Sequence, residues 1–114
     1  SFQAMAATPA ELLAGYTAQA GQPANASTGE AFFKASHGQE WQCTSCHGKS
    51  PMVGGRHAST DKAIEPLAPA ANAKRFADSA KAEKWFRRNC KDVLARECSA
   101  AEKADVLAWL ISLR

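Results

Sequence analysis

The chain has 114 residues, a length that suits one domain, and its net charge at pH 7 is only +3. That charge is too small to indicate nucleic-acid binding, and no run of 18 apolar residues is present that could cross a membrane. Large core residues are scarce, with five Phe, three Trp and one Tyr, so a bulky apolar prosthetic group would help to fill the core. We expect one domain over residues 1–114, with residues 1–7 a flexible N-terminus or a cloning remnant.

The sequence pattern is helical almost throughout, because no stretch shows the sustained alternation of a half-buried strand. Thr8 precedes Pro9, and Glu11 follows at the third helical position, which is a capping box. The same pattern recurs from Ser27 to Glu30 and from Ser99 to Glu102. We therefore predict helices at 9–20, 28–36, 79–95 and 100–113, and one further helical turn at the cysteine motif described below.

Residues 48–72 have the composition of a loop, with several Gly, Pro and Asn residues. A loop of this length is unusual in a compact domain unless it is functional or wraps around a ligand. We expect it to wrap around a prosthetic group.

Cys43-Thr44-Ser45-Cys46-His47 has the five-residue spacing of covalent haem attachment. Two intervening residues place both thiols on one face, where they can reach the two haem vinyl groups. The imidazole that follows can then reach the iron. The motif predicts one haem c, bonded to Cys43 and Cys46, with His47 as the proximal ligand.

Two other kinds of site, a thioredoxin-like redox site and a zinc site, also contain two cysteines at this spacing. A thioredoxin-like pair would follow a strand, and no strand is predicted before Cys43. A zinc site would need two more ligands, and the spacing of Cys90 and Cys98 is not typical of one. Covalent haem is the favoured interpretation.

Around this motif the chain resembles the class I cytochromes c. Gly29 and Phe33 lie where that family packs its N-terminal helix on its C-terminal helix, and the opposing face would hold Leu107, Trp109, Leu110 and Leu113. The resemblance implies an all-α class I cytochrome c fold, with about four to five helices around one haem. It also implies that the Pro66 carbonyl accepts the imidazole N–H of His47, which would fix the tautomer of the ligand.

The residue opposite His47 is less obvious. Class I cytochromes usually place a Met there, but the two Met residues here, Met5 and Met52, lie near the N-terminus and in the proximal loop. His37 ends a predicted helix, and His57 lies in the proximal loop. Met52 and His57 remain alternatives, although neither lies in the expected distal segment.

The chain is further identified as a member of the sphaeroides haem protein family, whose class I cytochromes bind oxygen. The similarity runs through residues 9–16, 64–69, 75–80 and 83–90, and ends in Cys98-Ser99 and the segment 104–110. In that family an Asn just before the first disulfide cysteine ligates ferric iron, which implies Asn89 as sixth ligand and a Cys90–Cys98 disulfide. Without the resemblance, a helical Asn beside two Arg residues would be interpreted as a solvated side chain.

The disulfide constrains the helix that contains Cys90. In one unbroken helix Cys90 and Cys98 would lie about 12 Å apart, whereas bridged Cα atoms lie within about 7 Å. The helix must therefore end between them, near residues 95–97.

The family resemblance also implies a function. A neutral Asn oxygen suits ferric iron, so we expect Asn89 to leave the iron on reduction and oxygen, nitric oxide or carbon monoxide to bind instead.

Residues 74–96 contain eight basic and three acidic residues, a patch that suits an acidic redox partner such as a dihaem cytochrome c. We expect a periplasmic protein whose signal peptide has been removed, since the spare cysteine pair suits an oxidising compartment. A simple electron shuttle remains an alternative, as does an enzyme that reduces oxygen, peroxide or a nitrogen oxide.

Overall fold

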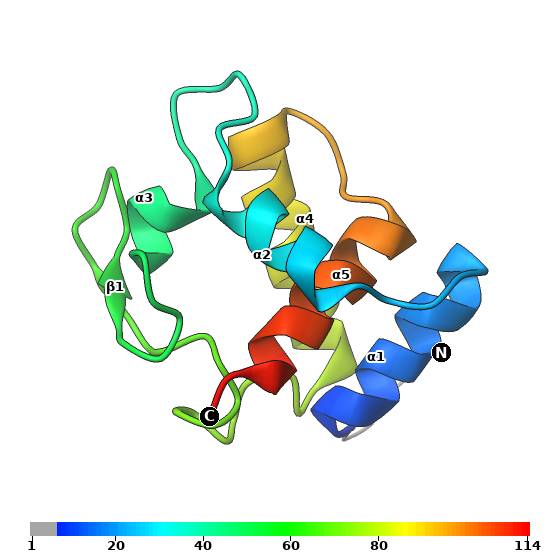
Figure 1. The fold of residues 1–114 in the computed structure, drawn as a ribbon. Helices are drawn as coiled ribbons and strands as arrows, with labels where there is room; N and C mark the ends of the chain where they lie inside the picture. The colour runs from blue at the N-terminus through cyan, green and yellow to red at the C-terminus, as the bar shows by residue number, and fades with distance from the viewer. Residues whose placement is uncertain (1–6) are drawn as a thin grey trace.

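The computed structural model describes residues 7–114, which form five helices and one two-stranded antiparallel hairpin (Figure 1). In chain order the elements are α1 Pro9–Ala20, α2 Ala26–Lys34, α3 Cys43–His47, β1 Gly55–Arg56, β2 Ala63–Ile64, α4 Ser79–Leu94 and α5 Ala100–Ser112. No helix within residues 7–114 is long and apolar enough to cross a membrane.

The helix boundaries follow the predicted caps with one exception. Two of the three expected capping boxes form, at the starts of α1 and α5. The box expected from Ser27 to Glu30 does not form, because α2 begins earlier than predicted. Its N-cap is Asn25, whose side chain accepts a hydrogen bond from the Thr28 amide at 2.9 Å. The Asn25 amide in turn donates to Asp105 Oδ1 at 2.8 Å. This contact with α5 stabilises the earlier start and is invisible to local sequence analysis.

Helices α2 and α5 pack closely because Gly29 has no side chain. A Cβ atom at Gly29 would overlap the backbone of Asp105. Beside this contact, the rings of Phe33 and Trp109 lie 5.2 Å apart in a core cluster with Val106 and Leu110. The predicted pairing of the two helices is therefore present.

Leu107 was predicted to face α2, but it lies in a second cluster with Tyr16 and Ala104. Residue 107 lies about 100° around α5 from residue 106, which turns its side chain toward α1. Helix α5 thus has α2 on one face and α1 on another.

Helix α4 ends at Leu94, where Ala95 adopts a left-handed conformation with φ of 60° and its amide donates to the Lys91 carbonyl. The turn brings Cys90 and Cys98 together in a disulfide, with Cα atoms 5.6 Å apart. The prediction that the helix ends between the two cysteines is confirmed.

The expected loop at 48–72 contains the hairpin, so the prediction that it has no regular structure is wrong at residues 55–56 and 63–64. Gly55 pairs with Ile64, and Arg56 pairs with Ala63. A Cβ atom at Gly55 would overlap the carbonyl of Cys46, so the hairpin lies directly against α3. Strands of two residues are too short to produce a pattern of alternation.

The prediction for residues 1–7 falls almost entirely outside the described residues. Ala7 is described, and its amide donates to the Ala77 carbonyl at 2.9 Å.

Candidate functional site

A cavity of about 560 Å³ lies between α3 and the hairpin on one side and α4 on the other. Its volume falls in the range of roughly 300–1,000 Å³ that is usual for cofactor and small-molecule sites. Apolar residues from several elements line it: Phe33, Leu67, Phe76, Phe86, Val93, Val106 and Leu110. The cavity therefore suits a large, mainly apolar ligand.

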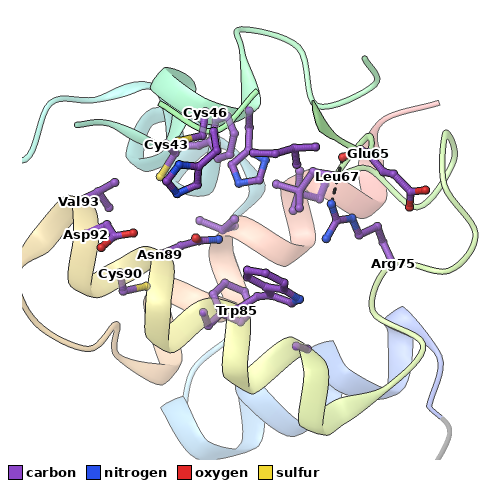
Figure 2. Close-up of a pocket in the computed structure, with 18 of the residues that line it drawn as sticks. Cys43, Cys46, Glu65, Leu67, Arg75, Trp85, Asn89, Cys90, Asp92 and Val93 are labelled. Carbon is purple, nitrogen blue, oxygen red and sulfur yellow. Dashed lines mark hydrogen bonds between the residues drawn. The ribbon is translucent and has the colours of Figure 1, made fainter. Parts of the chain in front are cut away.

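Cys43, Cys46 and His47 all line this cavity from α3, and Figure 2 shows the two cysteines side by side. In this helix Cys43 lies three residues from Cys46 and four from His47, which places the three side chains on one side of the turn. Gly48, with φ of 74°, then ends the helix. The structure thus brings the three predicted residues together on one wall.

Burial sets the ionisation of two of these side chains. It raises the pKa of the Cys43 thiol to about 11. Burial, assisted by the positive charge of Arg75, lowers the pKa of His47 to about 4. The imidazole is therefore neutral at pH 7, which is the form that ligates metals.

Asn89 lies across the cavity from this wall. Its side chain points from α4 toward the side that contains Cys43 and Cys46 (Figure 2). Among residues 7–114 its carboxamide has no hydrogen-bond partner, although backbone and side-chain hydrogen bonds are plentiful elsewhere. A polar group without a partner that faces an apolar cavity is available to a ligand.

The sequence contains a signal for Asn89. One stripe of α4 lines the cavity at the spacing of an amphipathic helix, and it contains Ala82, Trp85, Phe86, Asn89, Cys90 and Val93. Lys81 and Asp92 of the same helix also line the cavity. Asn89 is the one amide in this otherwise apolar stripe. Basic residues from the rest of the helix obscure the pattern when the sequence is inspected position by position.

The other candidates for the sixth position are less well placed. His37 does not line the cavity, and its Nε2 lies 2.8 Å from the Phe32 carbonyl oxygen. Met52 does not line the cavity either, and Met5 lies outside the described residues. The sixth ligand therefore has two remaining candidates in the cavity wall, Asn89 and His57.

His57 lines the cavity, but its Nδ1 accepts hydrogen bonds from the Ser59 and Thr60 amides at 3.2 and 3.3 Å. Ligation by a neutral imidazole through Nε2 requires the proton on Nδ1. His57 would have to give up both hydrogen bonds to bind iron, whereas Asn89 would give up none.

Pro66 lies near the cavity, in a different hydrogen-bond network from the one predicted. Its carbonyl accepts from Arg75 Nε at 3.1 Å and from Asn72 Nδ2 at 3.4 Å. The predicted hydrogen bond from His47 is not among those of the described residues.

Arg75 is a cavity residue that sequence analysis missed as part of the site. Its guanidinium bonds two backbone carbonyls, those of Glu65 and Pro66, and it lies on the opposite side of the cavity from the two cysteines (Figure 2). Its positive charge also acts on His47. Because its partners are backbone groups, no pattern of side chains in the sequence reveals this role.

The chemistry of the cavity fits a haem c. Two thiols lie on one wall beside a neutral imidazole, and a carboxamide faces them. Apolar side chains surround the space between, and a guanidinium at the far side suits a carboxylate-bearing edge. Every fully buried side-chain nitrogen or oxygen atom among the described residues has a hydrogen-bond partner. The Asn89 carboxamide, which has none, belongs to a half-buried residue that faces the cavity.

Comparisons with known proteins agree with this interpretation. Residues 19–110 match the family model described as "Domain of unknown function (DUF1924)". The chain is 48% identical over 107 residues to the cytochrome c-type protein SHP of Cereibacter sphaeroides, covering 90% of this chain and 82% of that protein.

Two solved structures show the same fold. The structure of oxidised SHP, described as an oxygen-binding cytochrome c, has a TM-score of 0.89 and 46% identity, covering 96% of this chain and 100% of that one. The solution structure of cytochrome c'' from Methylophilus methylotrophus, reported with insights into haem-ligand detachment, has a TM-score of 0.79 and 33% identity over 92% and 93% of the two chains. The predicted all-α class I cytochrome c fold and the single covalent haem c are confirmed.

Proposed function

The chain belongs to the DUF1924 family and to the sphaeroides haem protein family of c-type cytochromes, and from that premise we propose that it binds small gases at a position that Asn89 occupies in the oxidised protein and leaves on reduction. One observation carries the proposal: the Asn89 carboxamide, without a hydrogen-bond partner, faces the wall that contains Cys43 and Cys46.

The residues of α3 hold the haem. The Cys43 and Cys46 thiols each add to a haem vinyl group and form a thioether, and His47 is the proximal ligand. Arg75 bonds the Pro66 carbonyl and its charge acts on His47, and the Pro66 carbonyl is the predicted acceptor for the imidazole N–H. When bound, the haem supplies an iron atom that changes oxidation state and has one further axial position.

Asn89 responds to the oxidation state because of its chemistry as a ligand. Its carboxamide oxygen is hard and neutral, which suits the higher charge of ferric iron. Ferrous iron is softer and carries less charge, so Asn89 binds it more weakly and its side chain turns away. The freed axial position is then open to oxygen, nitric oxide or carbon monoxide.

The released side chain retains a second role. Its amide N–H groups remain beside the axial position and can donate a hydrogen bond to a gas. Asn89 is the one carboxamide among the α4 residues that line the cavity, where the charged Lys81 and Asp92 also lie. The properties described for the two relatives, oxygen binding in one and haem-ligand detachment in the other, support this proposal.

The electron donor is a redox protein with an acidic surface, such as a dihaem cytochrome c, that docks near residues 74–96. Two basic residues of this patch are engaged within the chain, because Arg75 bonds backbone carbonyls and Arg96 bonds Glu102. The exposed members on α4 that remain for a partner are Lys81, Lys84, Arg87, Arg88 and Lys91. We place the protein in the periplasm, as one cytochrome c domain over residues 1–114.

An optical spectrum of the reduced protein, with and without carbon monoxide, tests this function. The proposal predicts a five-coordinate high-spin ferrous haem that binds carbon monoxide without a slow displacement step. A simple electron shuttle would stay low-spin in both oxidation states and would not bind the gas. An enzyme that reduces oxygen, peroxide or a nitrogen oxide would additionally show turnover of that substrate.

A further inference from the structure

We propose that Glu83, held by Tyr16 and Lys103, is a positioning residue that sets the orientation of α4 and thereby directs Asn89 at the iron. The inference rests on the proposed ligation by Asn89. It assigns a role to a polar cluster that lies outside the haem cavity and contains no haem ligand.

Helix α4 has less helix packing than its neighbours. Helices α1 and α2 both pack along α5, through Tyr16 and Phe33 respectively. By contrast, the apolar stripe of α4 faces the cavity. The orientation of α4 therefore depends on a small number of specific links to the rest of the protein.

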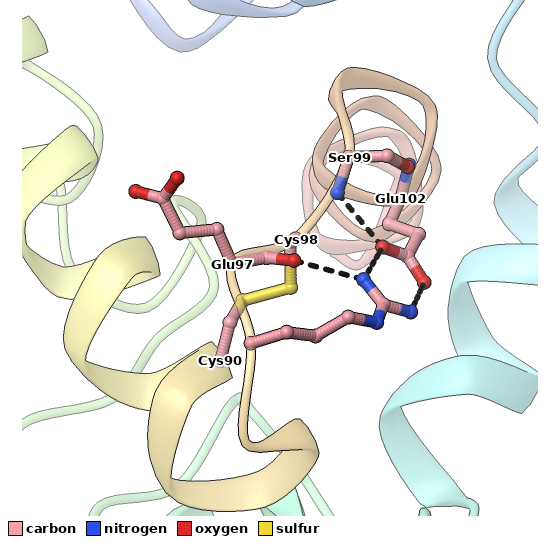
Figure 3. Close-up of polar contacts among 6 residues, drawn as sticks. Cys90, Glu97, Cys98, Ser99 and Glu102 are labelled. Carbon is pink, nitrogen blue, oxygen red and sulfur yellow. Dashed lines mark hydrogen bonds and ion pairs between the residues drawn. A yellow bond between two sulfur atoms is a disulfide. The ribbon is translucent and has the colours of Figure 1, made fainter.

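The first link is the Cys90–Cys98 disulfide, which joins α4 to the residue just before the N-cap of α5 (Figure 3). A single covalent link near one end of a helix still allows the helix to pivot. It fixes the position of residue 90 but not the direction of the helix axis.

The second link is the cluster around Glu83. The buried Tyr16 hydroxyl of α1 donates to Glu83 Oε1 at 2.6 Å. The Lys103 ammonium of α5 donates to Glu83 Oε2 at 3.2 Å and lies 5.5 Å from the centre of the Tyr16 ring. Glu83 thus joins α4 to two other helices at once, through hydrogen bonds to a charged group, which are stronger than neutral ones.

An aromatic contact extends the same link toward the haem. The Tyr16 ring meets Phe86 edge-on, with ring centres 5.7 Å apart, and Phe86 lines the cavity. The cluster therefore reaches the cavity wall on the same stripe as Asn89.

Helix geometry explains why the disulfide and the Glu83 cluster together suffice to fix the orientation of α4. Glu83 and Cys90 are seven residues apart, so they lie about 10 Å apart along the axis and within about 20° of the same face. Both attach to α5 or to its N-terminus. Together they fix the tilt of α4 and its rotation about its own axis. Asn89 lies next to Cys90, one residue step of about 100° around the helix, so a change of rotation would turn its carboxamide away from the iron.

The experiment compares Tyr16→Phe and Glu83→Gln with the parent protein, loaded with haem. Tyr16→Phe removes one hydrogen bond and keeps the ring, and Glu83→Gln removes the charge and keeps the shape. The readout is the share of ferric haem that binds water in place of Asn89, measured by the broadening of the electron paramagnetic resonance signal in H₂¹⁷O. We expect each variant to raise the ratio of water-bound to Asn-bound haem about threefold to tenfold, part of what a hydrogen bond to a charged group contributes.

Two controls separate this effect from general loosening. Glu30→Gln breaks the exposed Glu30–Lys34 ion pair on α2 and should leave the ratio unchanged. In an Asn89→Ala background, Tyr16→Phe should cause no further change in the ferric spectrum, because the ligand that it positions is absent.

The possible results separate a failure of the positioning role from a failure of the proposed ligation. If Asn89→Ala changes the ferric spectrum but Tyr16→Phe and Glu83→Gln leave it as in the parent, the positioning role is wrong and the proposed ligation survives. A shift of equal size with and without Asn89 would also overturn the positioning role. A ferric spectrum unchanged by Asn89→Ala would overturn both the ligation and the positioning role.

Discussion

Asn89 and Cys90 are adjacent on α4 yet have different partners, because the Asn89 carboxamide points into the cavity while Cys90 is bonded to Cys98 (Figures 2 and 3). The proposed ligand therefore lies next to the covalent crosslink of its helix. Its release can occur by rotation of one side chain while the backbone stays in place.

The first prediction concerns the disulfide. Replacing both cysteines by Ser should destabilise the protein by about 2.5 kcal/mol, the value expected for a closed loop of this length in the chain-entropy model. Denaturant unfolding of the haem-loaded protein measures the change. The parent protein, unfolded without reductant, should show no free thiol, because Cys43 and Cys46 are thioethers. Two reactive thiols in a parent protein whose haem is covalently bound would contradict the Cys90–Cys98 pairing.

The second prediction concerns haem attachment. Cys43→Ser should leave the haem bonded through Cys46 alone, so that it survives acid–acetone extraction with one thioether. Replacing both Cys43 and Cys46 should make all haem extractable. The mass of the denatured protein and the pyridine haemochrome spectrum distinguish the three states. Haem that resists extraction in the double variant would show that another residue holds it.

The third prediction concerns the contact of α2 with α5. Gly29→Ala should destabilise the protein by about 1–3 kcal/mol, because the new Cβ overlaps the backbone of Asp105. Gly15→Ala is the matched control, since a Cβ at this position in α1 meets no atom within 4 Å. That variant should be neutral or more stable by up to about 1 kcal/mol. Equal effects of the two substitutions on the thermal midpoint would argue against the close contact.

Much of the fold follows from the sequence, for reasons that are local. Thr8 and Ser99 form capping boxes with residues three positions ahead, so the starts of α1 and α5 can be predicted. The start of α2 could not, because Asn25 is stabilised by Asp105, eighty residues away. The hairpin was missed because its strands contain two residues each.

The residues of the site likewise divide into those that the local sequence reveals and those that only the folded chain reveals. The cysteine motif is local and was identified from spacing alone. Asn89 was identified by family resemblance, although the stripe of α4 carries an independent signal. Arg75 could not be identified, because its partners are the carbonyls of Glu65 and Pro66. Only the folded chain brings those groups beside it.

The fourth prediction concerns acid stability. Hydrogen bonds from the Arg96 guanidinium, with those from Ser99, lower the pKa of Glu102 from 4.5 to about 2 (Figure 3). Because the folded state favours the ionised carboxylate, this contribution is present above pH 4.5 and is lost as the pH falls toward 2. Glu102→Gln can retain the helix cap but should flatten the fall in the denaturation midpoint over this range. Glu30→Gln is the control, and an equal flattening there would contradict the assignment.

The ferric spectrum of Asn89→Ala tests the central claim most directly. Cys43, Cys46 and His47 are untouched in this variant, so the haem should stay covalently bound. Loss of the carboxamide should leave the ferric iron water-bound or open, and bound water should broaden the electron paramagnetic resonance signal in H₂¹⁷O, as it should not in the parent. Asn89→His should instead give a low-spin haem with two imidazole ligands, because imidazole is the stronger-field ligand. A ferric spectrum of Asn89→Ala identical to that of the parent would contradict the account, and His57 would then be the next ligand to test.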